Sequence, residues 1–213
     1  MLIQPEFIIY TGPMFSGKTS RLLSTLDRYK YQHKKMMVFK PRLDDRYSVS
    51  EVVTHGGWKR HAVCVKTGAD ILEHLANSDV NPHVVAVDEA FMIPGVSESL
   101  VWLFTNGFTV VVSSLEMSAS GKPFHEIVKM LVWATHVEKC CAVCTVCGRD
   151  AHYTHKKQVG GDELRPAEKR QPSKGHSGRT ELHKCRDKVH RAEKRRGDVE
   201  HHAQQPEGSS IRP

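Results

Sequence analysis

The glycine-rich segment Gly12 to Thr19 constrains the fold of this chain more than any other part of the sequence. It reads Gly-Pro-Met-Phe-Ser-Gly-Lys-Thr, which matches the phosphate-binding loop pattern of a glycine, four variable residues and then Gly-Lys-Ser/Thr. An apolar run, Phe7 to Thr11, precedes it, and apolar residues at helical spacing follow between Thr19 and His33. A chance glycine-rich turn would lack this strand and helix, so the context favours a phosphate site.

The chemistry expected of this loop follows from its backbone and two side chains. Its N–H groups would surround phosphate oxygens at the positive end of the following helix. Lys18 would reach the β- and γ-phosphates of ATP, and the Thr19 hydroxyl would bind Mg²⁺. We therefore expect ATP to contact Gly12, Pro13, Met14, Phe15, Ser16, Gly17, Lys18 and Thr19.

A second group of candidate residues follows the apolar run Val84 to Val87. An acid at the carboxyl end of a buried parallel strand lies at the ligand-binding edge of the sheet. Asp88 suits the role of holding Mg²⁺, and Glu89 could take a proton from a substrate hydroxyl. The alternative is that both acids cap the turn after the strand, but the phosphate loop favours catalysis. Ala90 and Phe91 would complete the ATP site.

Strand-like and helix-like segments alternate through the first part of the chain. Strands are expected at Phe7–Thr11, Met36–Phe39, Val84–Val87 and Thr109–Val112, and helices at 19–33, 96–104 and 124–131. This alternation predicts an α/β fold, a RecA-like parallel sheet of the P-loop type flanked by helices. After Ala134 the pattern changes, and Thr135 to Cys147 predicts a short, zinc-ribbon-like hairpin that carries cysteines.

Composition narrows the setting in which the protein works. No apolar run is long enough to span a membrane, and the N-terminus lacks the pattern of a secretory signal. Four of the six cysteines lie between Cys140 and Cys147, which is typical of a metal site in a reducing compartment, so we expect a cytoplasmic protein. Residues 155–213 hold six of the seven net positive charges. A nearly neutral body argues against specific nucleic-acid binding.

The cysteine pattern predicts half of a zinc site. Cys144 and Cys147 can supply two thiolates of a four-ligand structural site. The alternative is a pair of buried or reactive thiols in a small hairpin. Downstream of this pair the sequence holds one further cysteine, Cys185, between His183 and His190, and it is the candidate for a third ligand.

Several ordered motifs together resemble the thymidine kinase family of the cytosolic, bacterial and large-virus type. They are the phosphate loop with its Pro-Met-Phe insert, 40–48, Thr54-His55, 88–90, 113–115, 121–124, the hairpin 142–147, 151–154, and Val159 to Glu163. Together they span about three quarters of the chain. The resemblance implies transfer of the γ-phosphoryl group of ATP to the 5′-hydroxyl of thymidine, with ATP, Mg²⁺ and structural Zn²⁺ as cofactors and a homotetrameric assembly.

The resemblance also implies roles for individual residues. Glu89 matches the catalytic base, and Asp44 and Arg46 match a pair near the substrate phosphate. The family folds a segment called the lasso over the nucleoside, and this segment binds the base mainly through backbone groups. The residues implied at the thymidine site are Met14, Asp44, Arg46, Leu115, Phe124, Thr154, Val159 and Gly160.

These motifs, and the departures from the family pattern near the end of the sequence, predict that the chain has three parts. Residues 1–137 would form the ATP-binding α/β domain, 138–164 the zinc hairpin and lasso, and 165–213 a basic tail. The tail lacks aromatic residues and apolar periodicity, so we expect it to be disordered. Arg165 stands where the family has Tyr, and 166–179 contain no cysteine to complete the zinc site.

These departures leave rival functions open. One is a kinase for another deoxynucleoside, and a second is a degraded relative that binds nucleotide with weak or no turnover. A third, a zinc-hairpin nucleic-acid binder, leaves the phosphate loop unexplained and lacks aromatic residues in the tail on which bases could stack.

Overall fold

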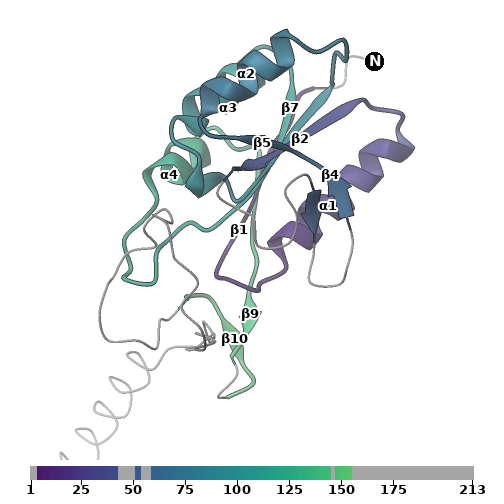
Figure 1. The fold of residues 1–213 in the computed structure, drawn as a ribbon. Helices are drawn as coiled ribbons and strands as arrows, with labels where there is room; N and C mark the ends of the chain where they lie inside the picture. The colour runs from purple at the N-terminus through teal and green to yellow at the C-terminus, as the bar shows by residue number, and fades with distance from the viewer. Residues whose placement is uncertain (1–3, 43–50, 54–58, 145–146, 155–213) are drawn as a thin grey trace, which may run out of the picture.

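The computed structural model describes residues 4–42, 51–53, 59–144 and 147–154. Over these ranges the centre of the protein is a sheet of six parallel strands in the order β5-β2-β6-β7-β1-β8 (Figure 1). The strands are β1 (Phe7–Thr11), β2 (Met36–Pro41), β5 (Val63–Val65), β6 (Val84–Asp88), β7 (Thr109–Ser114) and β8 (His136–Lys139).

Helices cover both faces of this sheet, and each face has its own apolar core. The helices are α1 (Lys18–Tyr31), α2 (Gly68–Ala76), α3 (Val96–Thr105) and α4 (His125–Leu131), with a 3-10 turn η1 (Ala90–Met92). Figure 1 shows α1 on one side of the sheet and the other three helices on the opposite side. Leucines of α1 pack with Ile8 and Val111, whereas Leu100 of α3 and Ile127 of α4 pack with Ile9 and other strand residues of the opposite face.

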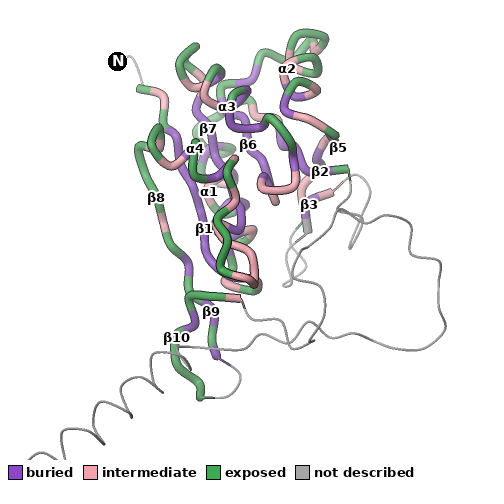
Figure 2. Tube along the Cα trace, turned by 90° about the vertical axis from the view of Figure 1, so that its left-hand side faces the viewer, coloured by how far each residue is buried: buried purple, intermediate pink, exposed green. Residues whose placement is uncertain are grey.

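Burial on both faces of the sheet explains why the sequences of the inner strands are continuous apolar runs. Every residue of β1, β6 and β7 is buried, because successive side chains enter the two opposite cores. Figure 2 shows these strands as the buried centre of the molecule, whereas β8 lies exposed at one edge. The predicted α/β fold with a parallel sheet and flanking helices is confirmed.

The described strands run further toward their carboxyl ends than the apolar pattern predicts. Three predicted strands extend to Pro41, Asp88 and Ser114. Polar side chains at these ends stay in the ladder because they have partners at the edge of the sheet. Asp88 lies directly opposite Ser113 on the neighbouring strand.

The region around the cysteines differs from the expected hairpin over Thr135 to Cys147. Its first part is β8, which pairs in parallel with β1, and the hairpin itself consists of β9 (Ala142–Val143) and β10 (Asp150–Ala151). The expected domain boundary at residue 137 therefore falls inside a strand of the main sheet. The division into three domains stays a prediction.

The remaining described elements are short. The strands β3 (Glu51–Val53) and β4 (Lys59–His61) form a separate antiparallel pair. Among the described residues, no helix is long and apolar enough to cross a membrane. Several predictions concern residues outside the described ranges, namely Asp44, Arg46, Val159, Gly160, Cys185 and the tail 165–213.

Candidate active site

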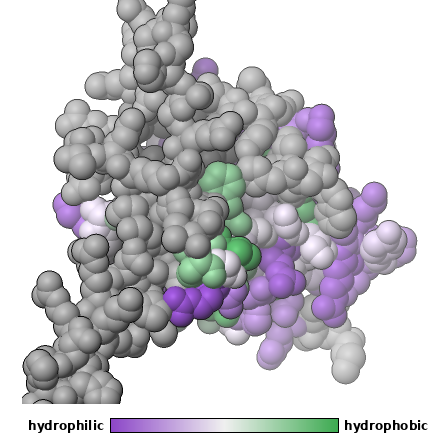
Figure 3. Space-filling model, turned by 90° about the horizontal axis from the view of Figure 1, so that it is seen from below, coloured by the Kyte–Doolittle hydropathy of each residue, from purple (hydrophilic) through white to green (hydrophobic). Residues whose placement is uncertain are grey.

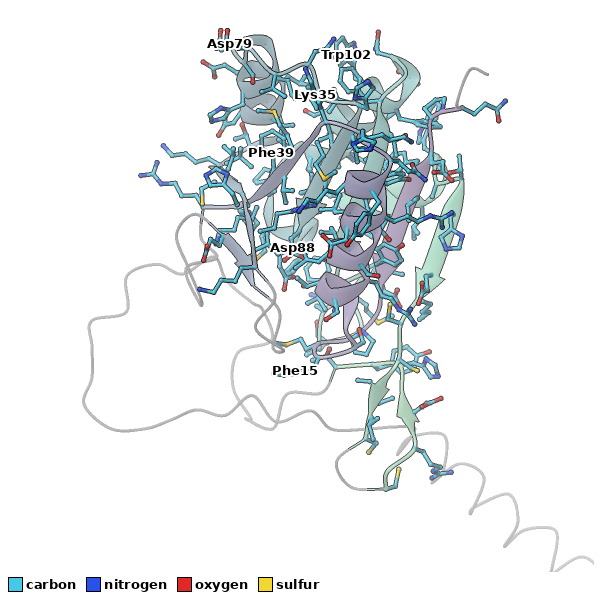
Figure 4. All side chains as sticks on the ribbon, turned by 90° about the vertical axis from the view of Figure 1, so that its right-hand side faces the viewer. Phe15, Lys35, Phe39, Asp79, Asp88 and Trp102 are labelled. Atoms are coloured by element: carbon cyan, nitrogen blue, oxygen red, sulfur yellow. The ribbon has the colours of Figure 1, made fainter. Side chains whose placement is uncertain are left out.

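The glycine-rich loop lies between β1 and α1, at the carboxyl edge of the sheet. Its backbone requires glycine at two places. Gly12 has a φ of 137°, and a Cβ there would lie 2.2 Å from the Cys140 carbonyl oxygen; Gly17, at the start of α1, has a φ of 78°. Phe15, at the exposed tip of the loop, also has a positive φ, of 59°. In Figure 4 it lies beyond the first turn of α1.

Lys18 is a buried cation within this loop. Its ammonium group donates to the Pro13 carbonyl oxygen at 2.6 Å and lies 3.5 Å from the Ser16 hydroxyl. Burial lowers the pKa of Lys18, and the carboxylates of Glu89, Asp88 and Glu116 act in the opposite direction. A lysine held in this way favours an anionic ligand, because added negative charge would offset the desolvation of the ammonium group.

Asp88 links the loop to the neighbouring strands. The Thr19 hydroxyl lies 3.2 Å from Oδ1 and 3.4 Å from Oδ2 of its carboxylate, and the Ser113 hydroxyl donates to Oδ1. Figure 4 shows Asp88 beside α1. A carboxylate and a hydroxyl are hard oxygen donors of the kind that Mg²⁺ prefers, so these residues fit the predicted metal role. Sequence reasoning paired Thr19 with Asp88 but missed Ser113.

Glu89 begins the turn η1 in an unusual backbone conformation. Its φ is 51°, a left-handed value that is uncommon for a residue other than glycine. Two residues later, the Phe91 N–H donates to the Ser114 hydroxyl at 3.0 Å, and the Phe91 ring contacts that of Phe124 with 4.6 Å between centroids. The structure therefore brings a predicted ATP contact and a predicted base contact together.

A polar cluster that sequence reasoning missed connects β1 and β8 with the segments that follow β7 and β10. Glu116 accepts a hydrogen bond from the Thr11 hydroxyl at 2.6 Å and pairs with the Lys139 ammonium at 2.6 Å. The same ammonium lies 5.5 Å from the centre of the Tyr153 ring. The neighbouring Leu115 is buried, as a residue that lines an apolar pocket would be.

Thr154 reaches the glycine-rich loop from the far end of the described chain. Its Oγ1 accepts a hydrogen bond from the Met14 N–H at 3.0 Å, across 140 positions of sequence. Two of the residues predicted to line the thymine pocket are therefore in direct contact. Seen from the end where the cysteine hairpin lies, the described surface shows a small apolar area among hydrophilic residues (Figure 3).

The cysteine hairpin carries both predicted zinc ligands that fall within the described residues, Cys144 and Cys147. Cys144 is buried together with Ala142 and Ala151, and Cys147 is exposed. Within the described ranges, no group of three or more His, Cys, Asp or Glu side chains could hold a metal ion. Thiolates suit zinc, but a closed structural site takes four ligands. The expected third ligand, Cys185, lies outside the described residues.

A phosphate loop after a buried parallel strand, with an acid at the end of another strand in the same sheet, defines the class of P-loop nucleotide-binding proteins. The family model for thymidine kinase matches residues 6–183, and the chain belongs to that family. The match runs past Glu163, where the recognisable motifs end. Membership supports a kinase that binds ATP and phosphorylates a nucleoside.

The chain is also similar to solved structures of the genome packaging NTPase B204 from Sulfolobus turreted icosahedral virus 2. The complex with sulfate is 15% identical with a TM-score of 0.40, over 67% of this chain and 76% of that chain. The complex with ATP-gammaS is 14% identical with a TM-score of 0.38, over 59% of this chain and 71% of that one.

Proposed function

We propose that the protein is a thymidine kinase of deoxynucleoside salvage, acting in the cytoplasm. It would transfer the γ-phosphoryl group of ATP to the 5′-hydroxyl of thymidine. The observation that carries the proposal is the contact of Thr19 with Asp88, next to the buried Lys18 and to Glu89. This combination supplies a phosphate loop, a cation, a metal-holding carboxylate and a second acid at one edge of the sheet.

The loop would bind the triphosphate through its backbone N–H groups, and Lys18 would contact the β- and γ-phosphates. The oxygens of Thr19 and Asp88 would hold Mg²⁺, which neutralises charge on the phosphate oxygens. Lys18 meets negative charge that grows during transfer, and such charge stabilisation is a large part of phosphoryl-transfer catalysis.

Glu89 would act as the base that accepts the proton of the thymidine 5′-hydroxyl. A bond forms between the 5′-oxygen and the γ-phosphorus, while the bond from that phosphorus to the oxygen bridging the β- and γ-phosphates breaks. ADP leaves with that bridging oxygen, and the proton stays with Glu89 until solvent removes it. Glu89 is only partly buried, so solvent can reach it.

The nucleoside would lie between the loop and the far end of the described chain. Met14, Leu115 and Thr154 would surround the thymine methyl group, and Phe124 would pack on the base. The contact between Met14 and Thr154 supports this pocket. Asp44, Arg46, Val159 and Gly160 would complete it by family resemblance, which also implies a homotetramer.

The test is conversion of thymidine and MgATP to ADP and thymidine monophosphate by the purified protein. Glu89→Gln should lower kcat by about 10²–10⁴-fold while the affinity for ATP changes little, because a positioned base contributes about that much. Glu98→Gln, on the exposed surface of α3, is the matched control and should keep full turnover.

Other outcomes point to the rival functions. ATP binding with no turnover of any deoxynucleoside would make the protein a degraded relative. Turnover of a different deoxynucleoside in preference to thymidine would correct the substrate. A parallel loss of ATP affinity and turnover in Glu89→Gln would make Glu89 a metal or structural residue and rule it out as the base.

A further inference from the structure

We propose that the adjacent serines Ser113 and Ser114 are positioning residues that fix the two acids of the site from opposite faces of the sheet. Ser113 positions the metal-holding Asp88, and Ser114 positions the base Glu89 through the η1 turn. The inference rests on the proposed function for the roles of these two acids, but the contacts themselves come from the β6–β7 register for Ser113 and from a hydrogen bond with η1 for Ser114.

Ser113 acts on the face of the sheet that α1 covers. It lies directly opposite Asp88 on the neighbouring strand, and its hydroxyl donates to Oδ1 of that carboxylate. Ser113 is 1% exposed and Asp88 5% exposed, so water cannot replace this donor without rearrangement. With Thr19 on the same carboxylate, Asp88 is held between two hydroxyl groups, which restrict its rotation.

Ser114 acts on the other face, because successive residues of a strand point to opposite sides. It is fully buried; its hydroxyl accepts the Phe91 N–H at 3.0 Å and donates to the Leu115 carbonyl oxygen at 3.2 Å. The accepted bond holds the η1 turn that starts from Glu89. A left-handed backbone at a glutamate is strained and persists only where its surroundings maintain it.

The chemistry of serine explains why both positions carry a hydroxyl. The preceding β7 residues Val110, Val111 and Val112 are apolar and buried, so burial in this strand does not by itself call for a hydroxyl. A buried hydroxyl group lowers the stability of the folded protein unless it is hydrogen-bonded. Both serines have partners, and those partners are a proposed metal-holding carboxylate and the turn that begins at the proposed base.

The two variants Ser113→Ala and Ser114→Ala should fail in different ways. Ser113→Ala removes one of the two hydroxyl groups that hold the Asp88 carboxylate. Mg²⁺ should raise the affinity for ADP about tenfold less in this variant than in wild type, the effect of losing a hydrogen bond to a charged group. Ser114→Ala should leave that gain within about twofold, and should lower kcat by about tenfold at unchanged KM for MgATP. Restoring the hydroxyl with threonine at each position should recover most of each loss.

The binding experiment is titration of ADP into wild type and variants with and without Mg²⁺, and it needs no nucleoside. Hydrogen exchange at the Phe91 amide is the second readout, because it should speed up in Ser114→Ala and not in Ser113→Ala. If Ser113→Ala does not fold, Ser113→Cys, a much weaker donor, takes its place. Both serines would be merely structural if the two variants lost binding and turnover alike, or if neither changed.

These readouts separate the inference from the proposed function. A wild-type protein that fails to phosphorylate thymidine overturns the proposed function, while the Mg²⁺ titration and the Phe91 exchange still decide the roles of the serines. An Mg²⁺ effect on ADP binding that is unchanged in Ser113→Ala overturns the role of Ser113, even in a fully active kinase.

Discussion

Lys18 illustrates how a single buried residue connects the stability of the protein with its function. Its ammonium group is desolvated and bonded to the Pro13 carbonyl oxygen of its own loop. Because burial lowers its pKa below the ordinary value of 10.5, folding disfavours the charged form. The protein therefore keeps a cation in a place where the charge costs stability, and a bound phosphate would offset that cost.

Lys18→Met should reduce turnover by at least about 10²–10³-fold, because charge stabilisation of the transferred group is lost. It should also change the pH dependence of stability. With a lowered folded pKa, the unfolded chain binds more protons at Lys18, so the free energy of unfolding of the wild type rises with pH as pH passes from the folded value toward 10.5. The variant should lack this rise, as measured by urea unfolding between neutral and alkaline pH.

The matched control is Lys30→Met, at an exposed position on the same helix, which should keep both turnover and the alkaline rise. If Lys18→Met retained the rise, another group would be responsible for it. If the variant retained near wild-type turnover, the loop would not be the phosphate site.

At the scale of elements, the apolar pattern was sufficient to predict the strands that are buried on both faces, but not the edge strand β8. Strands β1, β6 and β7 are buried on both faces, so their composition alone reveals them. The edge strand β8 has the sequence His-Val-Glu-Lys and is mostly exposed, so no such signal exists. Its pairing with β1 depends on backbone hydrogen bonds, which composition does not encode.

The candidate site shows the same division. The loop and the Asp88-Glu89 pair could be predicted because residue type and spacing specify their chemistry. Ser113 and Glu116 could not, because a serine or a glutamate carries no signal until the strand register places it beside a partner. The one usable hint was position, since both follow the apolar run of β7 at the edge where ligands bind.

Thr154→Val should show that the end of the described chain positions the glycine-rich loop. The variant keeps the shape of the side chain but removes the acceptor of the Met14 N–H. The loss of one such bond should lower kcat/KM for thymidine by about fivefold to tenfold, with KM for MgATP nearly unchanged. Steady-state kinetics with each substrate varied in turn make the measurement.

Thr154→Ser is the control, since it retains the hydroxyl oxygen and should stay close to wild type. If the serine variant lost as much as the valine variant, the methyl group would matter and the hydrogen bond would not. If Thr154→Val raised only KM for MgATP, the hydrogen bond between Met14 and Thr154 would instead belong to the nucleotide site.

At the scale of the whole molecule, we expect the integrity of the cysteine hairpin to depend on a bound metal. We expect Cys144 and Cys147 to be the zinc-binding thiolates of this hairpin, and a closed site takes four ligands. We therefore expect less than one tightly held zinc per chain, and its loss to a mild chelator. Elemental analysis before and after gel filtration with the chelator is the measurement.

Cys144→Ser and Cys147→Ser should remove the remaining zinc, whereas Cys141→Ser, an exposed neighbour outside the pair, should leave it unchanged. One tightly bound zinc per wild-type chain would contradict the prediction. Cys185 and a histidine near it would then be the leading candidates for the missing ligands.

The pairing of β1 with β8 has a consequence for how the protein unfolds locally. The Thr11 carbonyl oxygen accepts the Cys140 N–H at 2.7 Å, and the Cys140 carbonyl lies against Gly12. The segments that lead to the phosphate loop and to the cysteine hairpin thus separate only beyond this point. Fraying that starts in the hairpin therefore meets the main sheet at Cys140, and it passes that residue only if the edge strand β8 separates from β1. We therefore expect β8 and Cys140, which lead into the hairpin, to unfold together with β1 and the phosphate loop that follows it.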